Sequence, residues 1–470
     1  MCGIVAVSGI EHAAEQVFLG LYALQHRGQE AAGICAVDEG SARVYKAPGM
    51  VSDSFDDAVL DGLPGRTALG HTRYSTAGGP GLNNAQPLLV RYHRGDLALV
   101  HNGNITNALA LRTELVRDGA IFQSNIDTEV IVHLIARSRR ERPDEQVAEA
   151  LSRLAGAFSV LITIGDVVYA ARDPWGFRPL VLGRKDGGHV VASETCALDL
   201  LGAEFIRDLE PGELLRIEGD LVTPLPPLER APAPAPCIFE LVYFARPDSR
   251  LWGVSVDRAR RAFGHALARE QPADADCVFS VPDSSNSAAL GYSEASGIPL
   301  ELGLIRNHYV GRTFIHPTQA GRDFRVRIKY NPVREVIEGK RVVVVDDSLV
   351  RGTTSRGLVT LIREAGAREV HFRIASPPVR FPCYYGIDMP TREELIGARH
   401  SVDEIRRNLG VDSLGYLSLE GMESAVREFG PFCNACFSGN YQAPLVDVEG
   451  APGAPRARAR AGAGAGERRD

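Results

Sequence analysis

Hydrophobic residues in the first half of the chain fall into one helical stretch and several short strands. Apolar side chains recur at helical spacing over residues 13–24, and a polar turn at 25–30 follows them. This spacing predicts a helix that ends before the turn. Apolar runs at residues 67–71, 97–101 and 158–164 are short and bounded by polar loops, so each is expected to form a strand.

The second half of the chain alternates between helical and strand patterns. Helices are expected at residues 257–270 and 287–296, and strands at 277–281 and 300–305. Such alternation is typical of a doubly wound sheet with parallel strands. Four consecutive valines at 342–345 form a further run, too short for a helix and apolar enough for a strand buried on both faces. We expect this valine strand to lie at the centre of the sheet.

Prolines mark a boundary between the two halves. The stretch 224–236, PLPPLERAPAPAP, cannot sustain a helix or a strand ladder. A chain of 470 residues also exceeds what one hydrophobic core usually organises. We therefore expect two domains, at residues 2–232 and 237–445. Residues 446–470 are rich in Gly, Ala, Pro and Arg, a composition that predicts a disordered tail.

Composition narrows the class of function. Hydrophobic residues make up 44% of the chain and charged residues 24%, which is ordinary for a globular protein. Acids outnumber bases by 59 to 52, so the net charge of −7 offers no footprint for nucleic acid. The chain has no apolar run of roughly 20 residues, as a membrane span requires, and no basic flank typical of a signal peptide. We expect a cytoplasmic protein without a membrane partner.

Cysteine usage points to chemistry rather than to disulfide bonds. Eight cysteines in so long a chain, several inside expected strands, do not suggest a secreted disulfide framework. Metal binding or catalysis is expected of some of them. The cysteines at positions 35, 196 and 277 lie in strand or helix patterns and are expected in the core.

Polar residues directly follow the valine strand. Asp346 and Asp347 lie at its carboxyl end, where ligands collect in parallel sheets. The N–H groups of Gly352, Thr353 and Thr354 could converge on a phosphate where the next helix begins. Acids beside such amides predict a site for a phosphorylated sugar. The alternative is an ordinary helix cap; a nucleoside triphosphate site is disfavoured, because the loop lacks the P-loop lysine.

Cys2 is a candidate nucleophile. Removal of Met1 would leave a residue that carries both a thiol and a free α-amine. Because such an amine titrates close to neutral pH, it could take the thiol proton and activate the sulfur. A cysteine that merely follows the initiator methionine is the alternative. We expect no propeptide, and methionine removal to suffice.

The residues around Cys2 belong to a longer pattern. MCGIV, LQHRGQE, GHTRYST, HNGN and SNIDTE occur in order, and through them the chain resembles the N-terminal-nucleophile glutamine amidotransferases. In that family the cysteine attacks the glutamine amide, and preorganised donors hold the oxyanion. The resemblance implies catalytic roles for Cys2, Asn102 and Gly103, and glutamine-binding roles for Arg27, Arg73 and Asp127. For Arg27 a surface salt bridge is the alternative.

The valine strand and its loop, VVVVDDSLVRGTT, resemble the signature of type I phosphoribosyltransferases. There the paired acids face the ribose hydroxyls of phosphoribosyl pyrophosphate, and the loop grips its 5-phosphate. The implied binding residues are Asp346, Asp347, Ser348, Arg351, Gly352, Thr353 and Thr354. One Mg²⁺ ion is implied at Ser284, Asp346 and Asp347, with a helix cap as the alternative for Ser284. Whether the two acids hold ribose hydroxyls, metal or both stays open.

Two further features follow from the same resemblance. The polar stretch 309–332 resembles the loop that closes over phosphoribosyl pyrophosphate in amidotransferases of this type. Four cysteines, Cys237, Cys383, Cys433 and Cys436, suit either zinc or an iron–sulfur cluster by their chemistry alone. Their positions resemble the cluster-bearing branch of the family, which implies a [4Fe-4S] cluster that ties the ends of the second domain together. Zinc or reduced buried thiols are the alternatives.

Residues 1–442 as a whole resemble the amidophosphoribosyltransferases. The implied fold is an α+β N-terminal-nucleophile glutaminase domain, with four αββα layers, joined to an α/β type I phosphoribosyltransferase domain with a mainly parallel sheet. The implied reaction converts glutamine and phosphoribosyl pyrophosphate into 5-phosphoribosylamine, glutamate and pyrophosphate, the first step of de novo purine synthesis. A homotetramer inhibited by purine nucleotides is implied as well.

Two other classes of protein are alternatives. A glutamine-dependent sugar-phosphate aminotransferase would share the first half of the chain, but the signature VVVVDDSLVRGTT argues against it. A non-catalytic regulator that binds phosphoribosyl pyrophosphate would not need Cys2, Arg73 and Asp127 in place.

Overall fold

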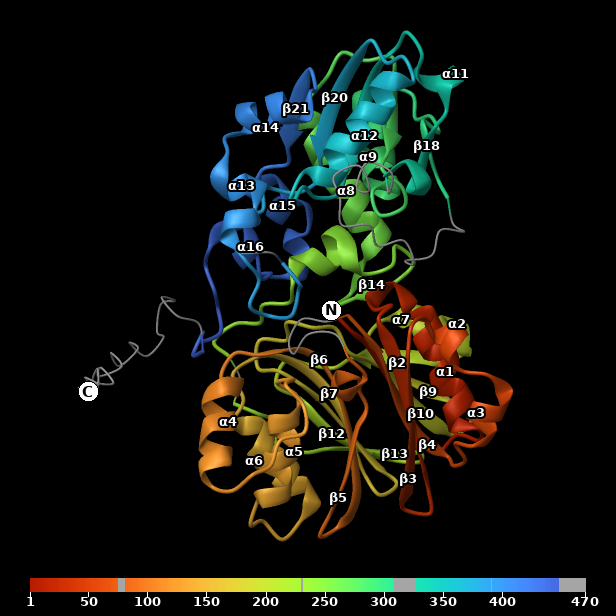
Figure 1. Cartoon of the computed structure of the whole chain (residues 1–470), viewed down its shortest axis with the longest axis vertical. Helices are drawn as coiled ribbons and strands as arrows, with labels where there is room; N and C mark the ends of the chain where they lie inside the picture. Colours follow the sequence, from red (N-terminus) through yellow and green to blue (C-terminus); the bar gives the residue numbers. More distant parts are fainter. Residues whose placement is uncertain (75–80, 230, 308–325, 390, 448–470) are drawn as a thin grey trace, which may run out of the picture.

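The computed structural model describes residues 1–74, 81–229, 231–307, 326–389 and 391–447. Two domains are stacked end to end, and the N-terminus of the chain lies between them (Figure 1). Residues 225–236 join the domains and form no helix or strand where they are described, as the prolines predict. The expectation is wrong for Pro224, which ends the strand Leu221–Pro224 opposite Leu215. Most of the expected lid, 309–332, and of the expected tail, 446–470, lies outside the described residues.

The first domain is a sandwich of two antiparallel sheets with helices on both outer faces. Its strands are β1 (Gly3–Ser8), β2 (Ala31–Asp38), β3 (Ser41–Pro48), β4 (Thr67–Arg73), β5 (Leu88–Tyr92), β6 (Gly95–Ile105), β7 (Gly156–Ile164), β8 (Val167–Arg172), β9 (Val181–Lys185), β10 (Gly188–Ala192), β11 (Glu204–Asp208), β12 (Leu214–Glu218) and β13 (Leu221–Pro224). They are ordered β11-β9-β10-β1-β4-β2-β3 in one sheet and β13-β12-β8-β7-β6-β5 in the other.

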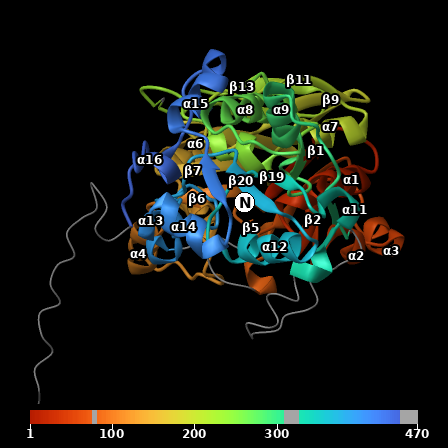
Figure 2. The ribbon, with the colours of Figure 1, turned by 90° about the horizontal axis from the view of Figure 1, so that it is seen from above.

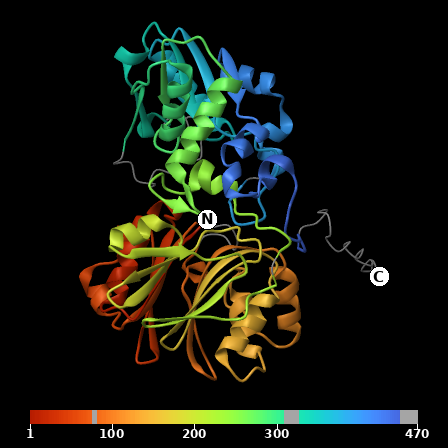
Figure 3. The same cartoon turned by 180° about the vertical axis from the view of Figure 1, so that it is seen from behind.

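Helices complete the outer layers of this sandwich. They are α1 (Ala13–Ala23), α2 (Val51–Ser54), α3 (Asp57–Asp61), α4 (Ala108–Arg117), α5 (Glu129–Arg137), α6 (Pro143–Ser152) and α7 (Thr195–Leu201). The first three and α7 cover one sheet, and α4 to α6 cover the other (Figures 1 and 3). Alternation along β1 explains the layering: Val5 and Val7 pack in the cluster under α1, while Ile4 and Ala6 pack between the sheets. The expected αββα architecture is confirmed.

The expected helix and strands of this domain are present, but all three strands are longer than their apolar runs, and β7 begins at Gly156. β4 extends to Arg73, and β6 extends to Ile105. Asn102 and Gly103 therefore lie inside a strand, where the polar HNGN sequence predicted a loop. The reason is the neighbouring strand: β7 continues the ladder opposite these polar residues, pairing Gly103 with Phe158. Ladder pairing here overrides the polar pattern.

The second domain is built on a parallel sheet. Its strands are β14 (Arg250–Leu251), β15 (Val254–Ser255), β16 (Cys277–Ser280), β17 (Leu304–Arg306), β18 (Tyr330–Pro332), β19 (Arg341–Asp346), β20 (Glu369–Ile374) and β21 (Ser413–Tyr416). Its helices include α8 (Val256–Glu270), α9 (Asn286–Ser296), α11 (Arg334–Ile337), α12 (Thr353–Glu364), α13 (Ile396–Arg399), α14 (Val402–Leu409), α15 (Leu419–Ala425) and α16 (Ala435–Ser438). The main sheet has the order β16-β19-β20-β21, with every pair parallel.

The valine strand is β19, an interior strand whose four valines are fully buried. The expected strand at 300–305 does not join this sheet as a whole. Only Leu300 bridges to Val278 of β16, and the chain then leaves to form β17, which pairs with β18 in a separate antiparallel ribbon. Leu302 is largely exposed at this departure, so an apolar run alone did not decide the pairing.

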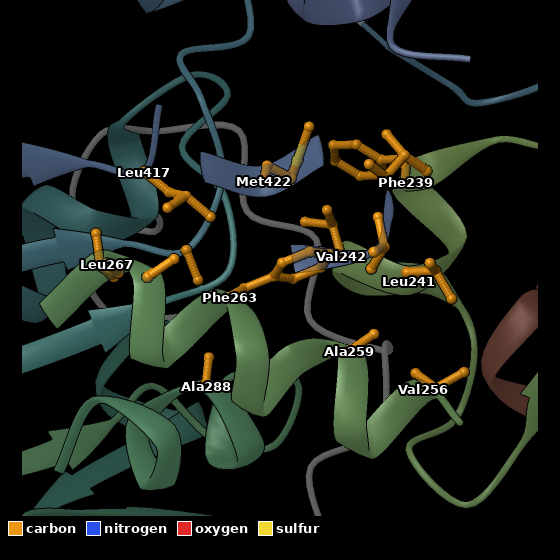
Figure 4. Close-up of a cluster of buried hydrophobic side chains, with 14 of the residues drawn as sticks. Phe239, Leu241, Val242, Val256, Ala259, Phe263, Leu267, Ala288, Leu417 and Met422 are labelled. Atoms are coloured by element: carbon orange, nitrogen blue, oxygen red, sulfur yellow. The ribbon is translucent and has the colours of Figure 1, made fainter. Parts of the chain in front are cut away.

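A hydrophobic cluster of the second domain lies next to the boundary between the domains. Leu241 and Val242, from a helical turn at Glu240–Phe244, pack against Phe263 of α8 and Met422 of α15 (Figure 4). Viewed from above, the N-terminus lies beneath the centre of the second domain (Figure 2). The turn Glu240–Phe244 is thus packed firmly by its own domain while it faces the start of the chain.

Candidate active sites

Cys2 lies at the entrance to β1, inside the first domain. Its N–H donates to Asn102 Oδ1 at 3.1 Å, and its thiol lies 3.6 Å from the carbonyl oxygen of Tyr74. The side chain is buried, and burial raises the pKa of the Cys2 thiol. A base is therefore needed to produce a thiolate at neutral pH.

Four of the predicted residues line one pocket beside this thiol. They are Cys2, Arg73, Gly103 and Asp127, and the pocket also includes His71 and His101. Asp127 is fixed by the N–H groups of Ile105 and Thr128, each at 2.9 Å. Arg73 donates to the carbonyl of Gly81 at 3.1 Å. A fixed carboxylate and a guanidinium in one pocket with a thiol suit an α-amino acid.

Asn102 has a polar atom that its surroundings do not satisfy. The side chain is fully buried, and its Oδ1 accepts from Cys2. Its Nδ2 has no hydrogen-bond partner among the residues that the structure describes. Buried donors are rarely left in this way, and at functional sites such a donor is available to a ligand.

Arg27 lies apart from this pocket wall. Its Nε donates to the main-chain oxygen of Cys2 at 3.0 Å, and its two terminal nitrogens pair with Glu194 and Glu240. The side chain is fully buried, so the ion pair is not the surface salt bridge considered from sequence. Arg27 therefore contacts the main chain of Cys2, while its predicted contact with glutamine stays a prediction.

The second site lies at the carboxyl end of β19. Ser284 donates to Asp347, Ser285 donates to Asp346 at 3.2 Å, and Ser348 donates to Asp347 at 2.6 Å. Burial, and then the charge of Asp347, raises the pKa of Asp346. Burial also raises the pKa of Asp347. Two adjacent buried carboxylates suit a cation or a polyhydroxyl ligand that relieves their repulsion.

The predicted phosphate loop follows directly. Gly352 has a φ of 76° and immediately precedes α12, which begins at Thr353. The structure thus puts Thr353 and Thr354 in the first turn of a twelve-residue helix, the position at which N–H groups hold phosphate. Arg351 instead forms an exposed ion pair with Glu394, 3.6 Å apart. Its predicted contact with phosphoribosyl pyrophosphate stays a prediction.

The four predicted cluster cysteines lie near one another. Cys237 and Cys433 are joined by a parallel main-chain bridge. The thiols of Cys237, Cys383 and Cys433 each act electrostatically on Cys436, whose pKa is raised chiefly by burial. Across the described residues, no group of three or more His, Cys, Asp or Glu side chains is placed to hold a metal ion.

Several residues at the domain boundary were missed by the sequence interpretation. Glu194, Glu240 and Arg178 form a buried charged cluster with Arg27. The main chain of Tyr384 accepts from Asn104 at 2.9 Å, beside Gly103. A glutamate after the apolar run Cys237–Phe239 was the only available sequence signal for Glu240, since an apolar run predicts burial of its neighbours.

Comparisons with known proteins cover nearly the whole chain. Residues 71–200 match the glutamine amidotransferase domain family. The chain is 49% identical over 453 residues to the amidophosphoribosyltransferase of Bacillus subtilis (strain 168), covering 94% of both chains. It is 47% identical over 461 residues to that of Methanocaldococcus jannaschii, covering 94% of this chain and 97% of the relative.

A solved structure agrees with these relatives. The B. subtilis glutamine phosphoribosylpyrophosphate amidotransferase complexed with ADP and GMP superposes with a TM-score of 0.89 at 48% identity. The match covers 94% of this chain and 98% of that one. Among the described residues, no helix is long and apolar enough to span a membrane.

The fold and the two sites define a glutamine amidotransferase joined to a phosphoribosyltransferase domain. The chain shares nearly half of its residues with two amidophosphoribosyltransferases over almost its full length, which narrows the class to one family. The chain belongs to the amidophosphoribosyltransferase family. It is an enzyme of the first step of purine biosynthesis, which uses glutamine and phosphoribosyl pyrophosphate to form 5-phosphoribosylamine, glutamate and pyrophosphate. The sugar-phosphate aminotransferase and the non-catalytic regulator are thereby set aside.

Proposed function

We propose that Cys2 is the nucleophile that releases ammonia from glutamine. Once Met1 is removed, the α-amine of Cys2 takes the thiol proton, and the sulfur attacks the side-chain amide carbon. The tetrahedral intermediate collapses to a glutamyl thioester, and the proton leaves with ammonia. Water then hydrolyses the thioester to glutamate and restores the thiol.

The observation that carries this proposal is the unpartnered amide of Asn102. A buried donor beside Cys2, without a partner in the described part of the chain, is available to the oxyanion of the intermediate. The N–H of Gly103, which lines the same pocket, is the second donor. Arg73 pairs with the α-carboxylate of glutamine, and Asp127 with its α-ammonium.

We propose that phosphoribosyl pyrophosphate binds at the end of β19. The first turn of α12 takes the 5-phosphate, and Asp346 and Asp347 take ribose hydroxyls, metal or both. The donor set supports Mg²⁺, because Ser284, Asp346 and Asp347 supply hard oxygen atoms. The raised pKa values of the two carboxyl groups show that their negative charges are poorly compensated within the protein. When bound, Mg²⁺ neutralises the departing pyrophosphate. Ammonia attacks C1 of the sugar as the bond between C1 and the pyrophosphate oxygen breaks.

We propose a [4Fe-4S] cluster at Cys237, Cys383, Cys433 and Cys436. Their positions resemble those of the cluster-bearing branch of the family, and three of the thiols lie close enough to the fourth to act on it electrostatically. The buried guanidinium of Arg178 interacts with the thiol groups of Cys237 and Cys383, which favours an anionic cluster. Iron and sulfide analysis of anaerobically purified protein tests this, and stoichiometric zinc without iron would overturn it.

We further propose the domain boundaries, the cellular location and the oligomeric state that were expected from sequence. The domains are residues 2–232 and 237–445, with a tail from 446. Eight free cysteines support a reducing compartment, the cytoplasm. The ADP and GMP held by the B. subtilis relative support inhibition by purine nucleotides. Size-exclusion chromatography with light scattering tests the proposed homotetramer.

One experiment tests the assignment of the two sites. Glutamate formation and pyrophosphate release are measured with glutamine or with ammonia, in the wild type and in Cys2→Ala. We expect the variant to lose glutamine-dependent turnover and to keep ammonia-dependent pyrophosphate release. Glutamine-dependent turnover in Cys2→Ala would show that the nucleophile is wrongly assigned.

A further inference from the structure

Four charged side chains are buried together where the two domains meet. Arg27, Arg178 and Glu194 belong to the first domain, and Glu240 belongs to the second. Each of the four side chains is 0% exposed. Their formal charges cancel, which is the condition under which buried ions are tolerated.

Glu240 makes two contacts with Arg27. Its Oε1 accepts from Arg27 Nη2 at 2.8 Å, and its Oε2 accepts from Arg27 Nη1 at 3.0 Å. Such a two-point contact fixes the plane of the guanidinium as well as its position. The same guanidinium donates through Nε to the main-chain oxygen of Cys2 at 3.0 Å. One carboxylate of the second domain is thus connected to the nucleophile by a single side chain.

The other members of the cluster cannot take the place of Glu240. Glu194 also accepts from His26 at 2.7 Å and from Ser249 at 2.7 Å. Burial opposes the charged form of Glu194, but His26 and then Arg27 hold its pKa below the ordinary value. Arg178 is held by the carbonyl of Tyr385 at 2.6 and 2.9 Å and by Glu240 at 3.3 Å. Without Glu240, Arg27 keeps only Glu194, a carboxylate that is already engaged, and Arg178 loses the carboxylate of its ion pair.

Packing fixes Glu240 itself. It begins the helical turn Glu240–Phe244, whose Leu241 and Val242 are buried in the core of the second domain (Figure 4). Arg27 ends the short turn that follows α1 in the first domain. The contact therefore transmits the position of one domain's core to the start of the other domain's first strand.

We propose that Glu240 is a positioning residue for the glutaminase reaction, acting through Arg27 on the main chain of Cys2. This rests on the proposed role of Cys2 as the nucleophile. It makes the glutaminase site a product of both domains, because its nucleophile is oriented by a carboxylate that the amidotransferase domain does not contain. We expect the chemistry at the sugar to be unaffected by loss of this one contact.

The test replaces the carboxylate by its neutral isostere, Glu240→Gln. A displaced thiol lowers the rate of the chemical step more than substrate affinity, since Arg73 and Asp127 stay in place. We expect kcat for glutamine to fall by about 10²-fold, the size of effect that a misplacement of about 1 Å produces, with KM for glutamine unchanged. Ammonia-dependent pyrophosphate release should equal that of the wild type. Asp248→Asn is the matched control, because Asp248 forms an exposed ion pair with Arg246 nearby.

A direct measurement follows the thiol itself. The rate of alkylation by 6-diazo-5-oxo-norleucine, a glutamine analogue, is measured and the labelled residue is found by mass spectrometry. Label on Cys2 with a lower rate in Glu240→Gln supports the proposal. Label on another residue overturns the proposed nucleophile, whereas label on Cys2 at an unchanged rate overturns only the role of Glu240.

Loss of folding is separated from loss of positioning by two further variants. Glu240→Asp keeps the charge but is one methylene too short for both contacts, so it should also lower kcat for glutamine alone. In an Arg27→Lys background, Glu240→Gln should add little, because both changes break one connection. Equal loss of glutamine- and ammonia-dependent turnover, or failure of both Glu240 variants to fold, would assign Glu240 a purely structural role.

Discussion

The two active sites handle buried charge in opposite ways. Around Cys2, the buried charges of Arg27, Arg178, Glu194 and Glu240 are matched and cancel. At the end of β19, Asp346 and Asp347 lie side by side, and burial with mutual repulsion raises the pKa of Asp346. The first site is electrostatically complete within the protein. For the second site, we propose that a cation and the ligand it accompanies supply the balance.

The two sites also differ in how many segments build them. The sugar-phosphate site comes largely from one stretch, residues 341–354, with Ser284 and Ser285 from a neighbouring strand end. The glutaminase site draws on the start of β1, on β4 and β6, on the segment that carries Asp127, and on two segments of the second domain, at Glu240 and at Tyr384. Changes to its supports should therefore harm glutamine use while leaving ammonia use intact.

The largest effect that separates the sites is expected from Asn102→Ala. This change removes the unpartnered Nδ2 that we propose as a donor to the oxyanion, and the acceptor for the Cys2 N–H. Loss of one such donor lowers kcat by about 10²–10³-fold. Glutamate formation should fall to this extent, while ammonia-dependent pyrophosphate release is kept. If both activities fell together, Asn102 would be a structural residue of β6.

No change at the second site should abolish ammonia use and leave glutamine use intact. Asp347→Asn should lower pyrophosphate release with glutamine and with ammonia alike, because both reactions use the same sugar. The expected loss is about 10- to 100-fold, the range typical of changes beside a bound metal. Titration with Mg²⁺ checks the cause, since the variant should need more Mg²⁺ for half-maximal rate. An unchanged Mg²⁺ dependence would leave Asp347 as a ribose contact only.

A smaller effect is expected where the second domain contacts β6, the strand that carries Asn102 and Gly103. A Cβ built on Gly386 would lie 2.8 Å from the carbonyl carbon of Gly103. Gly386→Ala should push this strand by less than 1 Å and lower glutamine-dependent kcat by about tenfold. The control is Gly410→Ala, which has a similarly positive φ, 73° against 102°, but meets no atom within 4 Å. Equal effects of the two variants would point to backbone strain instead of contact with Gly103.

The residues of the proposed sugar-phosphate site could be grouped from sequence more readily than those of the proposed glutaminase site, for a physical reason. A strand, two acids and a helix start follow one another between residues 341 and 354, so local pattern and local geometry coincide. The pairing of Cys2 with Asn102 spans 100 residues, and that of Arg27 with Glu240 spans 213. Motif resemblance identified Cys2 and Asn102 individually, but nothing in one sequence specifies which distant carboxylate an arginine meets.

Prediction of the fold from sequence also failed where a structural detail depends on a partner distant in the chain. The two domains and the αββα layers follow from periodicity and family resemblance, and the structural match confirms both folds. The end of β6 and the departure of residues 301–305 from the parallel sheet depend on the neighbouring strand. Strand ends are decided by pairing partners, which a one-dimensional pattern does not contain.

The smallest expected effect is on stability, and it has opposite signs at the two sites. The pKa of Asp346 is raised in the folded state. Between its ordinary pKa and this raised pKa, the unfolded chain therefore holds fewer protons than the folded protein. The free energy of unfolding therefore falls across that window and stays lower at neutral pH. Asp346→Asn should raise it, by on the order of 1 kcal/mol, in protein free of Mg²⁺ and ligand. Glu240→Gln should lower it, because its carboxylate balances buried cations. Urea unfolding at pH 7.5 and at pH 4 measures both, and the gain from Asp346→Asn should shrink at the lower pH as the wild-type carboxyl becomes protonated.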